Sequence, residues 1–352
     1  MKKLFMVVAL SLGLAGAAGL AAPRLQVEPQ EFEFGRVIEG IMVQATFTLT
    51  NVGDEPLVFT QKVHTSCGCT SAPLERDQLA PGESMELVVY FDSTGFGGRE
   101  VERTAELYTN DPQREKTILI IRGYVEEAAP FQDSASSLNY SFYVLVDLRS
   151  PEEYAQGHLL GAVNIPFQEL SEWLDRLPRE VVIYLYDTDG REATQAAQLL
   201  QEEGYPAARG IAGGLLGWWE AVGDAFFVWG EGVEAAAPTG TPYYGGYVIQ
   251  PQYVARSYQV ILDLRPPEEY AAGHFPGAVN LTREQLPDWA AGLPPVGRGV
   301  LYIWCVDADG TSACQAAQWL QENGYPDARC MTGGLKEWGI RYGTALLWPE
   351  DR

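Results

Sequence analysis

A long segment of this chain occurs twice, and the duplication constrains the fold more than any other feature. Residues 147–164 read DLRSPEEYAQGHLLGAVN, and residues 263–280 read DLRPPEEYAAGHFPGAVN. Further along, DTDGREATQAAQLLQEEGYP (187–206) matches DADGTSACQAAQWLQENGYP (307–326). IAGGLLGWW and MTGGLKEWG then close the two copies. Self-similarity of this length indicates a duplicated domain, so both copies are expected to form the same architecture.

Within each copy, strand-like apolar runs alternate with helix-like segments. In the first copy, YVLVDL and VVIYLY are typical of buried strands, whereas PEEYAQGH and REATQAAQLLQEEG are typical of helices. This alternation predicts a parallel sheet with helices on both faces. We place the two α/β domains at residues 141–228 and 247–345. Residues 229–246, rich in Gly, Ala, Pro and Thr, are predicted to be a linker.

Residues 23–125 carry a different, all-β pattern. Short β-rich runs are separated by turn clusters such as NVGDEP, APGE and TNDP. The expected strands are residues 31–34, 42–50, 57–63, 85–91 and 116–121. Short strands at this spacing favour an immunoglobulin-like (Ig-like) sandwich. Residues 126–140 are predicted to be a linker. The chain is therefore expected to be a multidomain protein in which an Ig-like β-sandwich precedes two α/β domains.

The N-terminus predicts export. Lys2 and Lys3 are followed by no charged residue until Arg24, and small residues at 15–19 follow the most apolar part. This arrangement is typical of a secretory signal peptide, which we assign to residues 1–22, with an uncleaved membrane anchor as the alternative. No further membrane span is expected. We predict a secreted, periplasmic or cell-envelope protein, in a compartment where thiols oxidise. The net charge of −23 makes nucleic acid an unsuitable partner.

Two family resemblances follow from these motifs. FEFGRVIEG, FTLTNVGDEPL, SCGCT, LAPGESMELVVYFD and LYTNDPQ resemble the DUF1573 family of exported bacterial Ig-like domains over the whole of residues 23–125. The string DLR-PEEY-GH-GAVN, with the later Gly-Gly pair and Trp, resembles the rhodanese-like domain in each copy. The second resemblance implies sulfur metabolism. In that family a loop of the form Cys-x-x-Gly-x-Arg-Ser follows a strand, and its cysteine carries sulfur as a persulfide.

Both corresponding loops lack the cysteine. Counting back three positions from the loop glycines gives Asp187 and Asp307, and a carboxylate cannot form a persulfide. The loops consist of Asp187, Asp189, Gly190, Arg191 and Glu192 in the first copy, and of Asp307, Asp309, Gly310, Thr311 and Ser312 in the second. Each loop carries an excess of negative charge, so we expect thiosulfate to be repelled. The aspartates are predicted either to cap the following helix or to form a cation or docking site.

The five cysteines cannot all pair within one chain. Cys305 is either the last residue of its strand or, if the loop is longer than usual, the nucleophile of a sulfurtransferase. By resemblance, Cys330 ends a neighbouring strand, which predicts a Cys305–Cys330 disulfide. In the string HTSCGC, Cys67 and Cys69 form a structural pair, a redox disulfide, or, together with His64, a copper or zinc site.

These observations favour a pseudoenzyme, which is a non-catalytic binding or scaffold protein of the cell envelope without a cofactor. Its partner is expected to be an envelope protein or a small ligand that is poor in anionic groups. A sulfurtransferase or sulfur carrier acting through Cys305, and a thiol-redox or metal-binding module at Cys67 and Cys69, are the alternatives. His158 and His274 are predicted to be structural. Arg149 and Arg265 are predicted to pair with the glutamates that follow them, which are Glu152, Glu153, Glu268 and Glu269.

Overall fold

The computed structural model describes residues 21–349, and its chain divides into two compact units. Within the described part, the first unit comprises residues 21–35, 44–91 and 102–123, and the second comprises residues 36–43, 92–101 and the chain from residue 124 onward. The predicted signal peptide lies almost entirely outside the described residues. No helix between residues 21 and 349 is long and apolar enough to cross a membrane.

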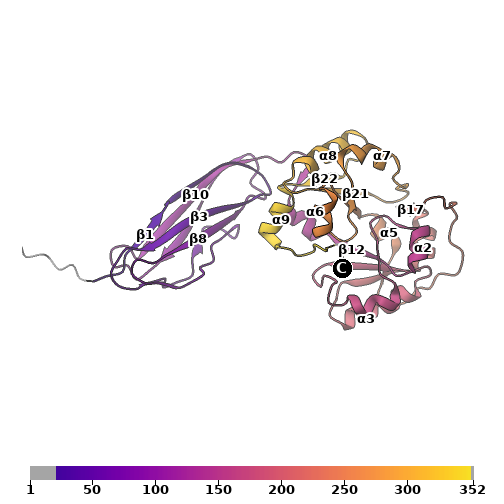
Figure 1. Ribbon diagram of the computed structural model, residues 1–352, viewed down its shortest axis with the longest axis horizontal. Helices are drawn as coiled ribbons and strands as arrows, with labels where there is room; N and C mark the ends of the chain where they lie inside the picture. Colours follow the sequence, from indigo (N-terminus) through magenta and orange to yellow (C-terminus); the bar gives the residue numbers. More distant parts are fainter. Residues whose placement is uncertain (1–20, 350–352) are drawn as a thin grey trace, which may run out of the picture. The chain divides into compact units, whose positions relative to one another are not determined.

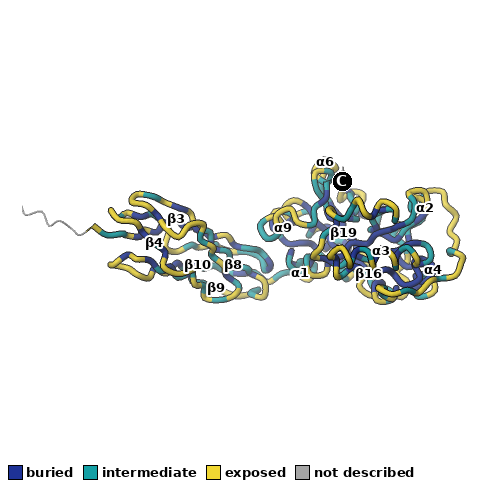
Figure 2. The backbone as a smooth tube through the Cα atoms, turned by 90° about the horizontal axis from the view of Figure 1, so that it is seen from below, coloured by how far each residue is buried: buried dark blue, intermediate teal, exposed yellow. Residues whose placement is uncertain are grey.

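The strands of residues 25–126 form the predicted sandwich. One sheet has the order β1-β3-β8-β6 and the other β2-β10-β9-β5, and their inner faces share a core that includes Leu87 and Ile121. Burial alternates along β3 (Figure 2), as expected for sheets with one solvated face. Phe47 and Leu49 are buried, whereas Thr46 and Thr48 are exposed. The strands are β1 (Leu25–Glu28), β2 (Glu31–Ile38), β3 (Met42–Asn51), β4 (Leu57–Val58), β5 (His64–Thr65), β6 (Thr70–Ser71), β7 (Gln78–Leu79), β8 (Ser84–Asp92), β9 (Arg99–Tyr108) and β10 (Lys116–Glu126).

Two features of the sandwich differ from the expected strands. The strand expected at residues 57–63 is limited to β4, a two-residue strand that pairs with β7. β9 is a strand of ten residues that the sequence pattern does not predict. Its buried residues, Val101, Ala105 and Leu107, are separated by charged or partly exposed ones, because only one face of the strand meets the core.

Each repeat forms a five-stranded parallel sheet flanked by helices, as the sequence predicts (Figure 1). The orders are β14-β12-β15-β16-β18 in the first repeat and β20-β19-β21-β22-β11 in the second. Every residue of the inner strands β12 (Tyr143–Asp147) and β19 (Tyr258–Asp263) is buried, because helices cover both faces.

The remaining elements of the repeats occur in matching order. The strands are β11 (Gln132–Asp133), β13 (Gly157–Leu159), β14 (Val163–Asn164), β15 (Val182–Tyr186), β16 (Ala208–Ile211), β17 (Phe227–Trp229), β18 (Val248–Ile249), β20 (Val279–Asn280), β21 (Leu301–Val306) and β22 (Ala328–Met331). The helices are α1 (Ala135–Ser141), α2 (Pro151–Gln156), η1 (Phe167–Trp173), α3 (Arg191–Glu202), α4 (Gly214–Val222), α5 (Pro251–Ala255), α6 (Pro267–Ala272), η2 (Arg283–Gln285), α7 (Leu286–Ala291), α8 (Thr311–Glu322) and α9 (Gly334–Tyr342).

In each sheet, one of the two edge strands comes from the segment that precedes the other repeat. β11 lies before the first repeat but pairs with β22 of the second, with Gln132 opposite Cys330. β18 lies before the second repeat but pairs with β16 of the first, with Val248 opposite Gly210. The helices that follow these strands continue the exchange, since α1 packs against α9 and α5 packs against α4. Each repeat therefore completes the sheet of the other.

This exchange corrects the two predicted linkers. Residues 126–140 contain β11 and most of α1, and residues 229–246 run along the first repeat. There the N–H of Gly230 donates to the carbonyl of Gln156, and the N–H of Tyr243 donates to the carbonyl of Asp189. An edge strand of two residues, such as β11, is too short to show a hydrophobic period in the sequence. The composition of the segment was therefore the one available signal, and it favoured a linker.

The two repeats also share their cores. Both large hydrophobic clusters of the second unit contain residues of each repeat. Buried polar groups are satisfied across the interface, where the Tyr258 hydroxyl donates to the Leu160 carbonyl at 2.5 Å and the Gln259 N–H donates to the Tyr143 hydroxyl at 3.0 Å. The pair of repeats is thus one folded body.

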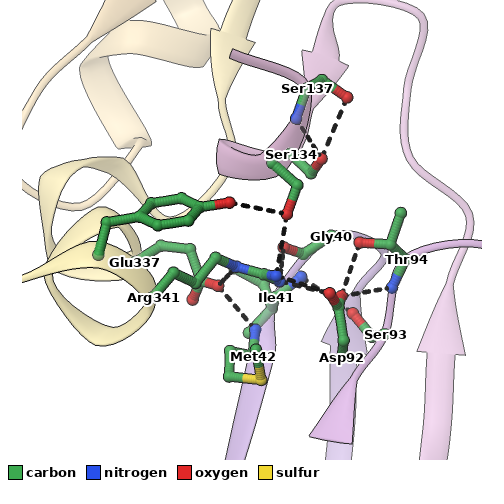
Figure 3. Close-up of polar contacts among 12 residues, drawn as sticks. Gly40, Ile41, Met42, Asp92, Ser93, Thr94, Ser134, Ser137, Glu337 and Arg341 are labelled. Atoms are coloured by element: carbon green, nitrogen blue, oxygen red, sulfur yellow. Dashed lines mark hydrogen bonds and ion pairs between the residues drawn. The ribbon is translucent and has the colours of Figure 1, made fainter. Parts of the chain in front are cut away.

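Within the second unit, Arg341 of α9 connects the second repeat to residues 36–43 and 92–101 (Figure 3). Its guanidinium pairs with Asp92 at 2.6 Å and with Glu337 at 2.5 Å, and it donates to the Gly40 carbonyl at 2.8 Å. Glu337 also accepts a hydrogen bond from the Met42 N–H at 2.8 Å. The Arg341 side chain is only 4% exposed, so these acceptors satisfy a buried cation.

Candidate functional site

The candidate loops lie at the carboxyl ends of β15 and β21, the edge at which open parallel sheets bind ligands. The first loop runs from the end of β15 to the start of α3 at Arg191. Gly190 has a φ of 92°, and a Cβ there would lie 2.7 Å from the Tyr243 carbonyl oxygen and 2.8 Å from the Gly213 nitrogen. Only glycine fits this conformation and this space. Gly310, with a φ of 87°, holds the same position in the second loop.

The carboxylate of Asp187 is turned into its own loop. Its Oδ1 accepts a hydrogen bond from the Gly190 N–H at 2.6 Å, and its Oδ2 accepts one from the Glu192 N–H at 2.9 Å. Asp187 is only 4% exposed. Burial raises the pKa of its carboxyl group, while the two N–H donors act in the opposite direction.

Asp307 makes the same arrangement with one more donor. Its Oδ1 accepts from the Gly310 N–H, and its Oδ2 accepts from the Ser312 N–H at 2.7 Å and the Ala313 N–H at 3.0 Å. These donors belong to the first turn of α8, where the helix dipole favours an anion. In both repeats the anion bound by the loop and the helix N-terminus is therefore the carboxylate of the protein itself. This arrangement corresponds to the first of the two alternatives from the sequence, in which the aspartates cap the following helix.

The duplicated Gly-Gly pair closes each loop from the opposite side. The Leu215 N–H donates to the carbonyl of Asp187 at 2.9 Å, and the Leu335 N–H donates to that of Asp307 at 2.8 Å. A Cβ at Gly214 would lie 2.5 Å from the Asp187 carbonyl oxygen. The backbone of the next helix therefore packs directly on the loop, and this close approach explains why the pair occurs in both repeats.

The charges around the first loop are mainly negative. Asp189 forms an ion pair with Arg191, so the arginine of the loop is already neutralised. Glu192 has a raised pKa, because of burial first and then because of the nearby carboxylates of Asp187, Glu153 and Asp189. A cavity of about 410 Å³ opens at this place. It is lined by Leu148, Arg149, Ser150, Glu153, Gln168, Asp187, Thr188, Asp189, Arg191 and Glu192.

The segment between the repeats covers part of the first loop. The Tyr243 N–H donates to the Asp189 carbonyl at 2.7 Å, and the Tyr243 carbonyl accepts from the Gly213 N–H at 3.1 Å. The guanidinium of Arg191 lies 5.4 Å from the centre of the Tyr243 ring. Sequence reasoning missed this contact. The tyrosine pair Tyr243–Tyr244, within a segment otherwise rich in Gly, Pro and Thr, was the one indication of it.

The duplicated DLR and GH motifs form the wall behind each loop. The Arg149 guanidinium pairs with Asp147, with Nε 2.9 Å from Oδ1, and donates to the Gly157 carbonyl at 2.7 Å. The predicted pairing of Arg149 with Glu152 and Glu153 is therefore wrong. The same holds for Arg265, which pairs with Asp263 instead of Glu268 and Glu269. Each arginine pairs with the aspartate two residues before it because the chain bends directly after the strand and brings the guanidinium next to that carboxylate. The carboxylate is fully buried and therefore requires a cationic partner.

The two histidines are structural, as predicted. The His158 ring stacks on Tyr154 with 3.9 Å between ring centres, and its Nδ1 lies 3.1 Å from the carbonyl oxygen of Tyr154. His274 and Tyr270 repeat this arrangement with a centre distance of 3.8 Å. Burial lowers the pKa of His158, which favours its neutral form.

The structure corrects the predicted Cys305–Cys330 disulfide. The two residues are neighbours in the register of β21 and β22, but Cys330 is bonded to Cys314. Cys314 lies in the first turn of α8, which packs on β22, so the helix supplies the partner. Cys305 is a fully buried free thiol. Burial strongly raises its pKa, with Asp307 adding to the effect, so the thiol stays protonated and is not placed as a nucleophile.

In the sandwich, Cys67 and Cys69 form a disulfide. Its sulfur atoms are therefore not available as thiolate ligands, and the His64, Cys67 and Cys69 set is not assembled as a metal site. His64 instead contacts the edge of Tyr108, with 5.5 Å between ring centres. Among residues 21–349, no group of three or more His, Cys, Asp or Glu side chains is arranged to hold a metal ion.

Comparison with known families identifies a domain family for each part of the chain. The chain matches the family described as "Rhodanese-like domain" at residues 130–221 and 251–340. It also matches "Protein of unknown function (DUF1573)" at residues 25–125. The two rhodanese-like matches together cover slightly more than half of the chain, and the first of them includes β11 and α1.

Two curated relatives match segments of about the length of one repeat. The chain is 39% identical over 72 residues to thiosulfate sulfurtransferase PspE of Escherichia coli, covering 20% of this chain and 68% of the relative. It is 34% identical over 74 residues to the uncharacterized protein YqhL of Bacillus subtilis, covering 21% of this chain and 59% of the relative. The match thus spans less than two thirds of YqhL. A solved rhodanese with anions from E. coli is 36% identical, covers 21% of this chain and 88% of that chain, and has a TM-score of 0.20.

Proposed function

We propose, on the premise that the chain belongs to the rhodanese-like domain family and carries a DUF1573 domain before its two rhodanese-like domains, that these two domains bind a partner and do not transfer sulfur. In this proposal the protein is an exported binding or scaffold protein of the cell envelope. Its rhodanese-like loops have been converted from a sulfur-carrying site into a fixed structural element.

One observation carries the proposal, and it is the position of the Asp187 and Asp307 carboxylates. Each accepts the N–H groups of its loop and of the following helix, which a persulfide and its sulfur donor would need. The site is therefore already filled by a negative charge. Because a carboxylate cannot be sulfurated, neither loop can carry sulfur at this position.

The charge of the first loop indicates what the site would accept. Asp187, Asp189, Glu153 and Glu192 face the cavity together with Arg149 and Arg191, and both arginines are paired with aspartates. An anion such as thiosulfate would meet uncompensated carboxylates. A cationic or neutral group, for example a lysine or arginine side chain of a partner protein, suits this surface better.

The sulfurtransferase alternative depends on Cys305, and burial argues against it. The thiol is fully buried in a core cluster that also contains Ile303 and Ala313. A nucleophilic cysteine requires an accessible thiolate, whereas burial favours the neutral thiol.

A thiosulfate–cyanide assay tests the proposal directly. The full chain is incubated with both reagents, and thiocyanate is measured against a heat-inactivated sample and against an active thiosulfate sulfurtransferase. We expect no thiocyanate above the heat-inactivated sample, and no heat of thiosulfate binding by calorimetry. Turnover by the wild type that is lost in Cys305→Ser would establish the sulfurtransferase alternative instead.

Export is tested separately by cell fractionation. The mature protein is expected in the periplasmic or envelope fraction with a new N-terminus close to residue 23. Recovery only in the cytoplasm, with Met1 retained, would contradict the envelope location and leave the binding role unaffected.

A further inference from the structure

The Cys67–Cys69 disulfide lies in the turn between β5 and β6, and each of these strands stands at the edge of a different sheet of the sandwich. Both cysteines are only partly buried, and Gly68 between them is exposed. A Cβ added at Gly68 would meet no atom within 4 Å. The disulfide is therefore open to a reactant from the side of the turn.

The two sulfur atoms have different surroundings. The Sγ of Cys69 accepts a hydrogen bond from the Nε–H of Arg103 at 3.3 Å. The hydroxyl oxygen of Thr70 lies 3.3 Å from the Sγ of Cys67 and 3.7 Å from that of Cys69. A guanidinium beside a sulfur atom favours its thiolate form. Cys69 is therefore the sulfur on which negative charge is better stabilised.

The position of Arg103 is fixed by its strand. Arg103 lies in β9, its Nη1 donates to the carbonyl of Glu102 at 2.7 Å, and its guanidinium carbon lies 5.4 Å from the centre of the Phe91 ring. A cation held in this way is oriented before any reaction, so little rearrangement is needed when a thiolate forms beside it.

We propose that Cys67–Cys69 is a thiol–disulfide exchange site, in which Cys67 is the sulfur attacked by an incoming thiolate and Cys69 is the leaving group. In the first step a thiolate of the reactant forms a bond to the Sγ of Cys67. The Cys67–Cys69 bond breaks, and its electron pair leaves on Cys69 as a thiolate beside Arg103. Exchange is faster when the leaving thiol has the lower pKa, so the position of Arg103 sets this direction.

The second step completes the electron balance. A second thiol of the reactant loses its proton to solvent and attacks the mixed disulfide, and Cys67 is released as a thiolate. The reactant dithiol is thereby oxidised to a disulfide by two electrons, and Cys67 and Cys69 are reduced to thiols. A disulfide-bonded compound in the same compartment restores the oxidised site by the reverse reaction.

The surface beside the disulfide indicates a peptide as the source of the thiols. A groove of about 1410 Å³ runs along residues 59–63 and 70–78, and Thr65 and Thr70, which flank the disulfide, line it. Edge strands offer backbone hydrogen bonds to an extended segment, the usual mode by which peptides add to a sheet. The reactant is therefore a cysteine-containing segment of a protein. A small thiol such as glutathione is the alternative source of the attacking thiolate.

The chain contains its own reference disulfide. Cys314–Cys330 joins α8 to β22, and Cys330 is fully buried. In the unfolded protein, a reducing agent would reach both disulfides equally. A reaction specific to the proposed site reduces Cys67–Cys69 and leaves Cys314–Cys330 intact in the folded protein.

The test treats the full oxidised protein, at neutral pH, with reduced glutathione or with an extended synthetic peptide that carries two cysteines, at equal thiol concentration. Samples are quenched with acid at successive times, alkylated, digested and analysed by mass spectrometry. We expect Cys67–Cys69 to be reduced at least about tenfold faster than Cys314–Cys330, with the mixed disulfide on Cys67 and the alkyl group on Cys69. The peptide is expected to react faster than glutathione.

Variants of Arg103 test its role in directing the exchange. Arg103→Gln is expected to slow the reduction of Cys67–Cys69 by about tenfold and to shift the pH dependence of the reverse reaction upward. Arg103→Lys, which keeps the charge, is expected to retain most of the rate. Arg99→Gln changes an exposed arginine of the same strand and serves as the matched control.

Each contrary outcome removes a defined part of the proposal. Equal reduction rates for the two disulfides, or a mixed disulfide mainly on Cys69, would overturn the exchange site or its direction. An unchanged rate of Cys67–Cys69 reduction in Arg103→Gln would show that Arg103 has no role in the exchange. Equal reduction rates with glutathione and with the peptide would contradict a protein segment as the reactant. The proposed exchange does not depend on the function proposed for the rhodanese-like domains, which supply only the reference disulfide Cys314–Cys330.

Discussion

Asp187 and Asp307 hold equivalent positions in the two repeats, and each carboxylate accepts hydrogen bonds from the first N–H groups of the helix that follows it. The two repeats therefore have the same loop arrangement. In each, a carboxylate lies where the resemblance to the rhodanese-like family implies a cysteine, and our proposal of a binding role rests on this position.

Removing the capping carboxylate is expected to destabilise the second repeat. Asp307→Ala leaves three N–H groups without their acceptor and should lower the free energy of unfolding by about 2 kcal/mol, measured by urea denaturation. Glu231→Ala, which changes an exposed carboxylate between the repeats, is the control and should change it by less than about 0.5 kcal/mol. Equal effects of the two substitutions would show that the cap does not stabilise the loop.

Glu192→Gln is expected to change how stability depends on pH. The folded pKa of Glu192 is raised, so the folded state binds the proton more tightly than the unfolded state, whose value is about 4.3. Wild-type stability therefore decreases as pH rises from about 4 through the raised folded pKa. Because the side chain is only partly buried, we expect the variant to gain only a few tenths of a kcal/mol at neutral pH and to show a flatter profile.

Unfolding measured at several pH values checks this prediction. Glu152→Gln, at an exposed position in the first turn of α2, is the matched control and should reproduce the wild-type profile. A variant profile as steep as that of the wild type would mean that burial and the nearby carboxylates do not raise the pKa of Glu192.

The two disulfides are expected to contribute unequally to stability. Cys314→Ala with Cys330→Ala opens a loop of 16 residues and should cost about 3 kcal/mol, whereas Cys67→Ala with Cys69→Ala opens a very short loop and should cost about half as much. Thermal unfolding of the oxidised double variants compares them. A larger loss at Cys67 and Cys69 would indicate that this pair is mainly a structural bond.

The exchange of outer strands predicts which fragments fold. A fragment of residues 142–256 contains all five strands of the first sheet, including β18, and α5. A fragment of residues 130–228 matches the limits of the sequence repeat more closely but lacks β18 and instead carries β11, which pairs with the second sheet. Circular dichroism should show the higher melting temperature for residues 142–256. The reverse order would mean that the exchange does not govern the stability of the repeat.

Arg341 is expected to stabilise the folded protein by neutralising the two carboxylates that it contacts. Arg341→Met leaves Asp92 and Glu337 without their cation and should cost about 3–5 kcal/mol. Combining it with Glu337→Gln should recover part of the loss, since one of the charges is then absent. Lys336→Met, on the exposed side of the same helix, is the control. Additive costs in the double variant would show that the two side chains do not interact.

Particular residues show how far sequence reasoning reached. The duplicated strings located both loops, and the count from Gly190 and Gly310 identified the aspartates that the structure places there. The pairing of Cys330 was predicted wrongly. Cys305 does lie opposite Cys330 in the register of β21 and β22, but α8 places Cys314 against β22, and Cys314 forms the bond. Nothing in the sequence places Arg103 beside Cys69, since 34 positions separate them and β9 was not predicted.

The sequence by itself determined the class of each domain, the duplication and the chemical identity of both loops, because hydrophobic period and motif spacing are local properties of the chain. Only the tertiary structure decided which strand completes which sheet, which cysteines are bonded and which cation faces a sulfur atom. These relationships join residues far apart in the chain. They depend on how helices and strands pack, and a one-dimensional pattern of apolar and polar residues does not encode that packing.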